Sequence, residues 1–478
     1  MITLINTNRM SPPIAPIGLD YLAGAARSAG IEVEVLDLGL AGDPPGAMRE
    51  YFSSRRPELV GLSFRNVDDS FWPSAAWFVP PLRDIVAAVR ALTDAPVVLG
   101  GAGFSIFPER IIQETKADFG VRGDGEQAMV RLVEELRGRR RFEQVPGLLW
   151  RAEGRTVVNE WAAEPTMPKV HAARDAIDNA TYFRLGGQMG VQTKRGCNRG
   201  CIFCADQLAS GSVLRLRPPR DVADEVEALH RRGIDVLHLC DGEFNVPRSG
   251  AMAVCEEMHR RGLGEKVRWY TYMAVIPFEA DLAEAMRRAG CVGINFTAPA
   301  ASEAMLCAYR QPHTQEELAE AVRLCREHRI TVMLDVMFGG PGETPQTVAE
   351  AIAFLKGIAP DCVGAGLGVR LYPGLEMTRI VEAEAPLHLN PGVVRRYEGP
   401  IDLLQPTYYV SPALGSAPAA LIREAIAGDA RFFEPCDAPS ADDQTRGYNY
   451  NDNDPLVRAI AAGARGAYWD ILRRSRGA

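Results

Sequence analysis

Residues 189–204 read MGVQTKRGCNRGCIFC, an apolar segment followed at once by three cysteines within eight positions. The apolar segment predicts a short buried β-strand, which places the cysteines on the loop at its C-terminal end. Three thiolates in a C-x3-C-x2-C run can bind three irons of a cubane cluster and leave the fourth iron open. The spacing therefore predicts a [4Fe-4S] cluster on Cys197, Cys201 and Cys204.

Zinc is the main inorganic alternative for this group of thiols. A structural zinc site takes a fourth Cys or His at matching spacing, and the nearest histidines are His171 and His230. Packing is a poor explanation as well, since buried cysteines prefer apolar elements and this loop carries Lys194, Arg195 and Arg199. The other cysteines show no such spacing, and we assign them to packing: Cys240, Cys255, Cys291, Cys307, Cys325, Cys362 and Cys436.

The strand at residue 189 opens a series of alternating strands and helices. Further strands are expected in VLHLCD, VRWYTY, VGINFT, TVMLDVMF and CVGAGLGV, with amphipathic helices such as PRDVADEVEALHRRG between them. Six such strands predict a partial (β/α)6 barrel over residues 186–380, with the chemistry at the C-terminal ends of the strands. The alternation then stops, so residues 381–478 are expected to form a mainly helical and loop C-terminal domain that caps the substrate.

The first 142 residues also alternate strands, such as ITLINT, ELVGLSF and APVVLGG, with helices expected near 18–29 and 80–92. This order predicts an α/β, Rossmann-like domain whose parallel sheet is covered on both faces. A hairpin and linker are expected over residues 143–185. Two glycine-rich loops, GGAGFSIFPE and VRGDGE, follow strands of the first domain and so lie at the edge where such sheets bind ligands.

Composition excludes several classes of protein. A chain of 478 residues with 47% hydrophobic residues has ample material for several cores. The net charge of -8 comes from interspersed acidic and basic residues, so no face for nucleic acid is expected. No window of 18 uncharged apolar residues occurs, which predicts no membrane span. Ten cysteines are too sparse for a disulfide framework, and the chain is expected to be cytoplasmic.

The cysteine loop, with the aromatic Phe203 before its last cysteine, resembles the motif of the radical S-adenosylmethionine superfamily. The resemblance implies that S-adenosylmethionine binds the open iron. An electron from an external donor, such as flavodoxin or ferredoxin, would then release a 5'-deoxyadenosyl radical. In this family, an acidic or glycine segment such as Asp241-Gly242-Glu243 often holds the methionine amino group.

Two further segments are implied to contact S-adenosylmethionine. Gly339 and Gly340 begin GGPGET, which resembles the turn beside the adenine; alone, it would be only a strand-to-helix turn capped by Thr344. Arg310 would either bind the carboxylate of S-adenosylmethionine or form a surface ion pair.

A Rossmann-like domain ahead of a radical barrel resembles the cobalamin-binding branch of this superfamily. IAPIGLDYLAGAARSAG is similar to the opening helix of that branch, and the two glycine-rich loops to those that receive cobalamin. Glycines let a backbone approach a large planar ligand closely. A nicotinamide or flavin site is less favoured, because no G-x-G-x-x-G turn follows the first strand. The implied cobalamin contacts are Pro16, Gly18, Gly100, Gly101, Gly103, Phe104, Gly123, Gly125 and Glu126.

The seven histidines all lie at position 171 or beyond, so the first domain cannot supply an axial imidazole to cobalt. The loop SFRNVDD is the candidate to shield the face of cobalt that lacks a histidine, and Arg65 and Asn66 are its residues expected to contact the cofactor. A buried Arg65 would discourage an axial ligand and favour methyl transfer. Alternatively, Arg65 pairs with Asp68 or Asp69 and only shapes the loop.

This loop, the opening INTNRMSPPIAPIG and the tail GYNYN are similar to the class B subgroup that contains the tryptophan 2-C-methyltransferase. In that enzyme a glutamate occupies the open iron, and S-adenosylmethionine supplies only methyl groups. Glu243 would take that position here. Tyr450, in GYNYN, is expected to line the catalytic pocket, whereas Tyr468 and Trp469 are expected in the core.

The sequence thus predicts a cobalamin-dependent radical S-adenosylmethionine enzyme that transfers a methyl group, via methylcobalamin, to a carbon of a small molecule. A second hypothesis keeps both cofactors and uses them for ring contraction or cyclisation. A third is a non-catalytic cobalamin or redox sensor. The sensor is disfavoured because the complete barrel and the GGPGET turn would then have no task.

Overall fold

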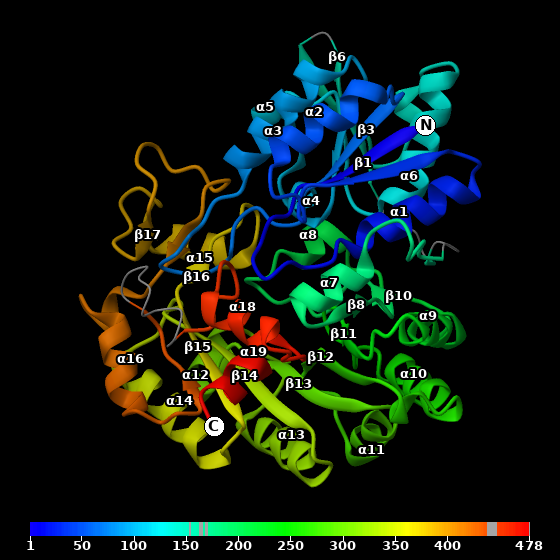
Figure 1. Ribbon diagram of the computed structural model, residues 1–478. Coiled ribbons are helices and arrows are strands. Elements are labelled where there is room, and N and C mark those ends of the chain that lie inside the picture. Colours follow the sequence, from blue (N-terminus) through cyan, green and yellow to red (C-terminus); the bar gives the residue numbers. More distant parts are fainter. Residues whose placement is uncertain (153, 162–165, 168–170, 437–446, 478) are drawn as a thin grey trace.

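The computed structural model describes residues 1–152, 154–161, 166–167, 171–436 and 447–477. Two seven-stranded sheets, built mainly from parallel strands with helices between them, dominate this part of the chain. Figure 1 shows the first sheet in blue at the top and the second in green and yellow below it. The expected α/β class is confirmed.

The N-terminal sheet has the strand order β2-β1-β3-β4-β5-β6-β7. Strands β1 to β5 run parallel, and their order is one of the doubly wound arrangements that bind ligands at the carboxyl edge. These strands are β1 (Ile2–Asn6), β2 (Val33–Asp37), β3 (Leu59–Ser63), β4 (Val97–Gly100) and β5 (Phe119–Val121).

Helices cover both faces of this sheet. On one face, α1 (Ile17–Ser28) and α6 (Gly125–Arg137) bury Leu19, Leu132 and Val133 against β1 and β5. The opposite face is covered by α2 (Pro44–Ser54), α3 (Val79–Leu92) and α5 (Pro108–Thr115), and the short α4 (Ala102–Ile106) follows β4. The domain is therefore Rossmann-like, as the alternating pattern predicts.

A hairpin of β6 (Leu148–Ala152) and β7 (Arg155–Val158) extends the same sheet through antiparallel pairs. Leu148 packs into the core on one face and Leu149 into the core on the other. The hairpin therefore belongs to the sheet, which continues past residue 142, where we expected the first domain to end.

The second sheet forms the partial barrel. All its neighbours pair in parallel, in the order β19-β15-β14-β13-β12-β11-β8. The six expected strands are present, and β19 is a seventh that the sequence pattern did not indicate. The strands are β8 (Met189–Val191), β11 (Val236–Leu239), β12 (Arg268–Ala274), β13 (Cys291–Thr297), β14 (Thr331–Phe338), β15 (Cys362–Leu367) and β19 (Phe432–Phe433).

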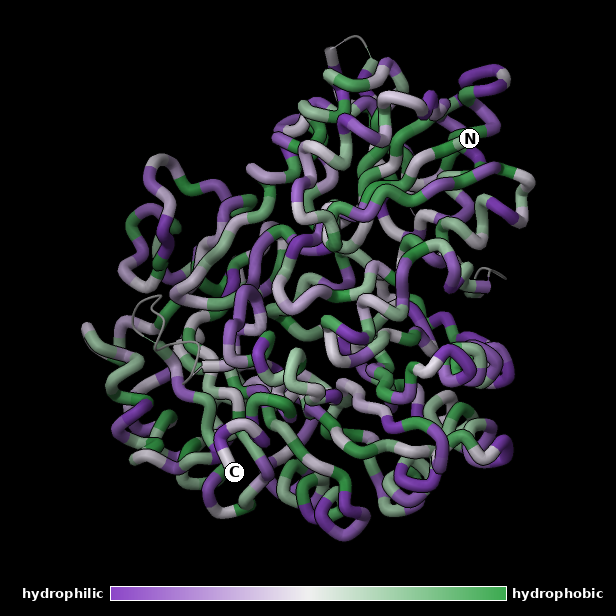
Figure 2. Tube along the Cα trace, viewed as in Figure 1, coloured by the Kyte–Doolittle hydropathy of each residue, from purple (hydrophilic) through white to green (hydrophobic). Residues whose placement is uncertain are grey.

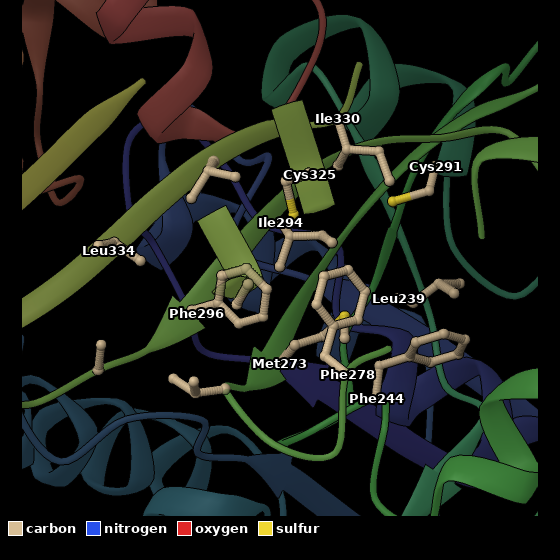
Figure 3. Close-up of a cluster of buried hydrophobic side chains, with 14 of the residues drawn as sticks. Leu239, Phe244, Met273, Phe278, Cys291, Ile294, Phe296, Cys325, Ile330 and Leu334 are labelled. Carbon is tan, nitrogen blue, oxygen red and sulfur yellow. The ribbon is translucent and has the colours of Figure 1, made fainter. Parts of the chain in front are cut away.

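Amphipathic helices line the outside of the barrel and bury their apolar sides against the strands. Figure 3 shows part of this core, with Phe296 and Ile294 of β13 beside Met273 of β12 and the thiols of Cys291 and Cys325. The helices are α9 (Pro219–Arg231), α10 (Arg248–Arg260), α11 (Ala280–Arg288), α12 (Glu303–Ala308), α13 (Gln315–Glu327), α14 (Pro345–Ile358) and α16 (Pro418–Ile426).

The packing expected of the remaining cysteines holds for most of them. The buried ones are Cys255, Cys291, Cys325, Cys362 and Cys436. Cys307 is exposed, because it lies on the outer side of α12, and Cys240 is only half-buried. For these two residues the packing assignment was wrong.

The C-terminal segment shares a core with the barrel. Helices α18 (Asp454–Ala461) and α19 (Tyr468–Ser475) bury Leu456, Trp469 and Ile471 against strand residues of the barrel. Figure 1 shows both helices in red over the barrel strands. The segment that we expected as a separate capping domain therefore completes the barrel instead. Beside it lie α15 (Glu376–Glu384) and a small sheet of β16 (Val369–Arg370), β17 (Val393–Arg395) and β18 (Thr407–Tyr409).

Hydropathy follows these layers. Figure 2 shows hydrophobic residues concentrated in the strands and hydrophilic residues along the outer helices. Among the described residues, no helix is both long enough and apolar enough to cross a bilayer.

Candidate functional site

A cavity of about 730 Å³ lies where the carboxyl edges of the two sheets meet. Its first wall is the N-terminal domain, including Asn6, Ser63, Arg65, Gly100 and Gly123. Its second wall is the barrel, including Gly190, Gln192, His238, Cys240 and Tyr272. Both folds thus present the edge that is expected to bind ligands to a single shared space.

The C-terminal tail closes the cavity on a third side. Tyr450 reaches it, as we expected, together with Asn449. Tyr468 and Trp469 are buried and also line the cavity, so the core assignment covers only part of their role. The Asn449 amide donates to Asp69 over 3.1 Å, which joins the tail to the loop after β3.

The three cysteines lie on a loop closed by a two-stranded ladder of β9 (Lys194–Arg195) and β10 (Arg215–Leu216). The backbone N–H of Cys197 donates to Gly211, and that of Asp206, at the start of α8 (Asp206–Ser210), donates to the sulfur of Cys204 over 3.5 Å. All three thiols are half-buried and free of disulfides. Burial raises the pKa of Cys201 to about 11 and that of Cys204 to about 12, so cluster assembly must displace their protons.

This donor set fits a cubane cluster. Within the described residues, no three Cys, His, Asp or Glu side chains converge as ligands of one metal ion. A cubane does not need that convergence, because each thiolate binds a different iron. The loop therefore offers three separate sulfur ligands with a backbone donor at one of them.

Asp241 and Glu243 differ in what they can do. Asp241 accepts from the hydroxyl and the backbone N–H of Thr193 and from the backbone N–H of Lys194, so both its oxygens hold the loop that leads to Cys197. We expected Asp241 to contact the cofactor directly, but these bonds make it a positioning residue.

Glu243 is 7% exposed, and its Oε2 has no hydrogen-bond partner. Burial raises its pKa to about 7, while the Thr297 hydroxyl opposes the shift. Burial raises the pKa of Cys197 and Cys201, and the charge of Glu243 adds to both shifts. Glu243 therefore combines a free oxygen with a position within electrostatic range of two sulfur ligands.

The residues expected around the adenine form a compact group. Phe203 packs edge-on against Tyr309, with ring centroids 5.8 Å apart, and the Tyr309 hydroxyl occupies the place where a side chain at Gly340 would lie. Gly339 has φ +95 and donates its N–H to the Glu343 carboxylate. A hydrogen bond within the turn thus stabilises it. Glycine is needed at position 339 for its positive φ and at position 340 because the Tyr309 ring leaves no room for a side chain.

Arg310 is not part of the cavity wall. Its side chain is 61% exposed and forms an ion pair with Glu376 at 2.9 Å. Of the two alternatives for Arg310, the structure has the surface ion pair.

Most of the expected cobalamin contacts line the cavity, but two do not. Gly103 packs on the backbone of Asn66, where a Cβ would lie 2.9 Å away. Phe104 points into the core and is 0% exposed. We therefore correct both assignments, because these residues shape the loop from behind. The expected residues that do line the cavity are Pro16, Gly18, Arg65, Asn66, Gly100, Gly101, Gly123, Gly125 and Glu126.

Arg65 projects into the cavity from the loop after β3. It does not pair with Asp68, which binds Arg370 at 2.9 Å, or with Asp69, which binds Ser74 and Asn449. In the described part of the chain, the Arg65 side chain donates to Asn66 over 3.0 Å and has no carboxylate partner. The side chain is exposed to the open cavity, so our expectation of a buried Arg65 was wrong. Partial desolvation by the surrounding protein still lowers its pKa.

Comparison with known protein families assigns the N-terminal domain and the barrel. Residues 5–133 match the B12 binding domain, and residues 191–355 match the radical SAM superfamily. This chain is a cobalamin-binding radical SAM protein. It is 29% identical over 441 residues to the tryptophan 2-C-methyltransferase of Streptomyces laurentii. The alignment covers 79% of this chain and 74% of that protein.

A solved structure extends the likeness to the whole fold. The radical S-adenosylmethionine methyltransferase TsrM from Kitasatospora setae, with tryptophan and a SAM analog bound, superimposes with a TM-score of 0.91 at 29% identity. The match covers 100% of this chain and 98% of that one. The cobalamin-dependent radical SAM enzyme OxsB shares the fold, with a TM-score of 0.71 at 17% identity. The chain is accordingly a cobalamin-dependent radical SAM methyltransferase.

The sequence pattern did not predict several residues that line the cavity of this radical SAM protein. The rings of His238 and Tyr272 pack at a tilt of 52°, with centroids 5.0 Å apart. Burial lowers the pKa of His238 to about 4, so its imidazole is neutral near pH 7. Cys240 lines the cavity at the end of β11, and Lys194 lines it just before the cysteine loop. All four lie at or near the C-terminal end of a strand, and that position was the available signal.

Proposed function

We propose that this chain methylates a carbon of a small aromatic substrate, with an indole-bearing amino acid as the first candidate. The observation that carries the proposal is the group of aromatic rings that line the shared cavity, Tyr272 from the barrel and Tyr450 and Tyr468 from the C-terminal tail. Such rings pack well against a planar aromatic ligand. The tryptophan bound by TsrM supports the same substrate class.

Arg65 would keep one side of the cobalamin site free of a metal ligand. Cobalamin, when bound, supplies a carrier for the methyl group between donor and acceptor. A guanidinium has five donors and no acceptor, so it offers cobalt no lone pair. The absence of a carboxylate partner in the described residues leaves Arg65 oriented toward the cavity, and the first domain contains no histidine.

Glu243 would provide the fourth ligand of the cluster. Its free Oε2 and its proximity to Cys197 and Cys201 support this role. S-adenosylmethionine would then serve only as methyl donor, and no 5'-deoxyadenosyl radical would form. This version of the function is the one that we favour.

Anaerobic incubation of the loaded enzyme with S-adenosylmethionine and tryptophan tests both parts of the proposal. We expect a methylated amino acid and S-adenosylhomocysteine without 5'-deoxyadenosine. Failure to methylate any aromatic amino acid would contradict the substrate class. Formation of 5'-deoxyadenosine in step with product would contradict the fourth ligand, and would instead indicate a radical route.

We further propose a flavodoxin or ferredoxin as the external reductant, and the cytoplasm as the location. Free thiols at all three cluster positions support a reducing compartment. Activity restored by a purified flavodoxin and its reductase, in place of a chemical reductant, would support this donor class. Activity restored only by small-molecule reductants would contradict it.

A further inference from the structure

Lys194 is a buried cation without a partner. Its side chain belongs to β9 and is 3% exposed, and its Nζ has no hydrogen bond. No ion pair of Lys194 exists among the described residues. Burial raises the pKa of Asp241 and of Glu243, and the charge of Lys194 opposes both shifts. Burying an ammonium in this way costs folding free energy unless an anion arrives to pair with it.

The position of Lys194 connects the cluster loop with the cavity. Its backbone N–H donates to Asp241 over 3.2 Å, and it lines the cavity next to Gly196 and Gly242. A Cβ at Gly242 would lie 3.9 Å from the Cβ of Cys197. Gly242 thus lies beside the first cluster ligand, and Lys194 lies in the same cavity wall, on a backbone that has its own hydrogen bonds.

Three of the other cations around this loop are already engaged by carboxylates. Arg195 binds Glu126 at 2.6 Å, Arg215 binds Asp124, and Arg217 binds Glu225 at 2.7 Å. These three pairs neutralise most of the positive charge near the loop, and Arg65, which has no carboxylate partner in the described residues, lies on the loop after β3 in the first wall of the cavity. Arg195 lines the cavity, whereas two further arginines lie outside its wall: Arg199, which donates to the carbonyl of Ile276, and Arg310, which lies on the surface.

The role of Glu243 as fourth ligand, on which this inference rests, creates a need for such a cation. If a protein carboxylate takes the iron, the methionine carboxylate of S-adenosylmethionine has no metal to bind. A buried carboxylate requires a charge partner. We propose that the Nζ of Lys194 binds the methionine carboxylate of S-adenosylmethionine through a charge-assisted hydrogen bond.

Two ligands that differ only in this carboxylate test the proposal. Binding of S-adenosylmethionine and of decarboxylated S-adenosylmethionine would be measured anaerobically by equilibrium dialysis, on enzyme loaded with cluster and cobalamin. We expect the wild type to prefer S-adenosylmethionine by about 10- to 100-fold, the range of a hydrogen bond to a charged group. In Lys194→Met and Lys194→Gln this preference should vanish through weaker binding of S-adenosylmethionine alone. Lys194→Arg should retain part of it.

Arg310→Gln is the matched control, because it removes a cation that lies outside the cavity, and we expect it to bind both ligands as the wild type does. Iron content and cluster absorbance would show that each variant is loaded. Equal weakening of both ligands in Lys194→Met would mean that Lys194 acts through the fold or the cluster, and would overturn the proposal. An unchanged preference would overturn it as well.

The same experiment separates this proposal from the proposed function. Binding is measured without turnover, so a chain that methylates no aromatic amino acid can still show the Lys194 effect. A change in the EPR spectrum of the cluster on addition of S-adenosylmethionine would instead show that the donor reaches the iron. In that case Glu243 is not the fourth ligand. The proposal for Lys194 would then be kept only if the preference for S-adenosylmethionine over its decarboxylated form is still lost in the Lys194 variants.

Discussion

Among single residues, Glu243 makes the sharpest difference between two kinds of radical SAM chemistry. A carboxylate beside Cys197 and Cys201 competes with the donor for the open iron, whereas a neutral amide competes poorly. Its unpartnered Oε2 means that no hydrogen bond need be broken for it to bind the iron.

Glu243→Gln is therefore expected to keep its iron but lose methyl transfer by at least about tenfold, since one charged interaction is worth roughly 1.5–3 kcal/mol. S-adenosylmethionine should now perturb the EPR spectrum of the cluster, and 5'-deoxyadenosine should appear. Glu243→Asp retains a carboxylate and should show neither change. A wild type whose cluster spectrum already responds to S-adenosylmethionine would contradict this account.

Arg65 is the second residue for which a single substitution tests the proposed role, because its guanidinium has no lone pair to offer cobalt. Arg65→His would place an imidazole lone pair in the cavity at the position of a group that has none. We expect the absorption spectrum of bound cobalamin to shift toward a base-ligated form and methylation to fall at least about tenfold. Arg65→Met lacks a nitrogen ligand and should leave the spectrum unchanged. An unshifted spectrum in Arg65→His would place Arg65 away from the metal.

The sequence could predict residues whose chemistry is tied to spacing, but not residues whose role depends on orientation. Cys197, Cys201 and Cys204 were predictable because their thiols act within one loop. Phe104 was not, because a loop residue can face either the ligand or the core, and its ring fills space beside Gly120. Lys194 looked like one of several cations, and only the structure shows which of them already have partners.

Among the elements, the strands were the most predictable. Each barrel strand from β8 to β15 is an apolar run long enough to give a signal, whereas β19 has only two residues and no detectable period. The hairpin β6–β7 was recognised as a hairpin, but its place at the edge of the first sheet depends on pairing with β5, which local pattern does not reveal. Long-range pairing likewise decides that α18 and α19 complete the barrel.

The contact between α6 and β9 joins the cobalamin loop to the cluster loop. Glu126 at the start of α6 accepts two hydrogen bonds from Arg195, at 3.0 and 2.6 Å, and both side chains are largely buried. We expected Glu126 to contact the cofactor, but this pairing uses its carboxylate to fix the two loops together. Burial opposes ionisation of Glu126, yet Arg195 outweighs it and lowers the pKa of the carboxyl.

Glu126→Gln should therefore lower the free energy of unfolding by about 3 kcal/mol, because buried Arg195 then keeps as carboxylate partner only Asp124, at 3.3 Å, which it shares with Arg215. Since the pKa of Glu126 is lower when folded, its stabilisation is present above the ordinary value of 4.5 and is lost as the pH falls. The difference in the free energy of unfolding between the wild type and Glu126→Gln, measured by urea unfolding, should therefore become smaller at low pH. Arg323→Gln, which breaks an exposed pair on α13, should change stability by less than about 1 kcal/mol.

Across the whole molecule, a buried charge network joins the two domains. Arg174, from the segment between the two sheets, binds Asp20 of α1 at 3.3 Å and Glu225 of α9. Tyr21 and Arg217 complete the group, with the guanidinium of Arg217 over the Tyr21 ring. The cavity lies between the domains, so its shape depends on this network.

Arg174→Met tests that dependence, because it leaves two buried carboxylates to share the remaining charge of Arg217. Burial already raises the pKa of Asp20 to about 7, and Arg174 limits that rise. A carboxyl whose pKa is higher when folded destabilises the fold increasingly as the pH rises from its unfolded value to its folded one. Without Arg174 the folded pKa should rise further, so a loss of about 3 to 5 kcal/mol is expected at pH 8 and a smaller one at pH 5.

Urea unfolding of Arg174→Met at the two pH values measures this effect, and retention of cobalamin through gel filtration reports on the cavity. Adding Asp20→Asn to Arg174→Met removes the acid that must stay protonated, and should restore much of the stability lost at pH 8. A pH-independent loss in Arg174→Met would mean that Arg174 acts by packing alone. The ion network would then not be what holds the cobalamin domain over the barrel.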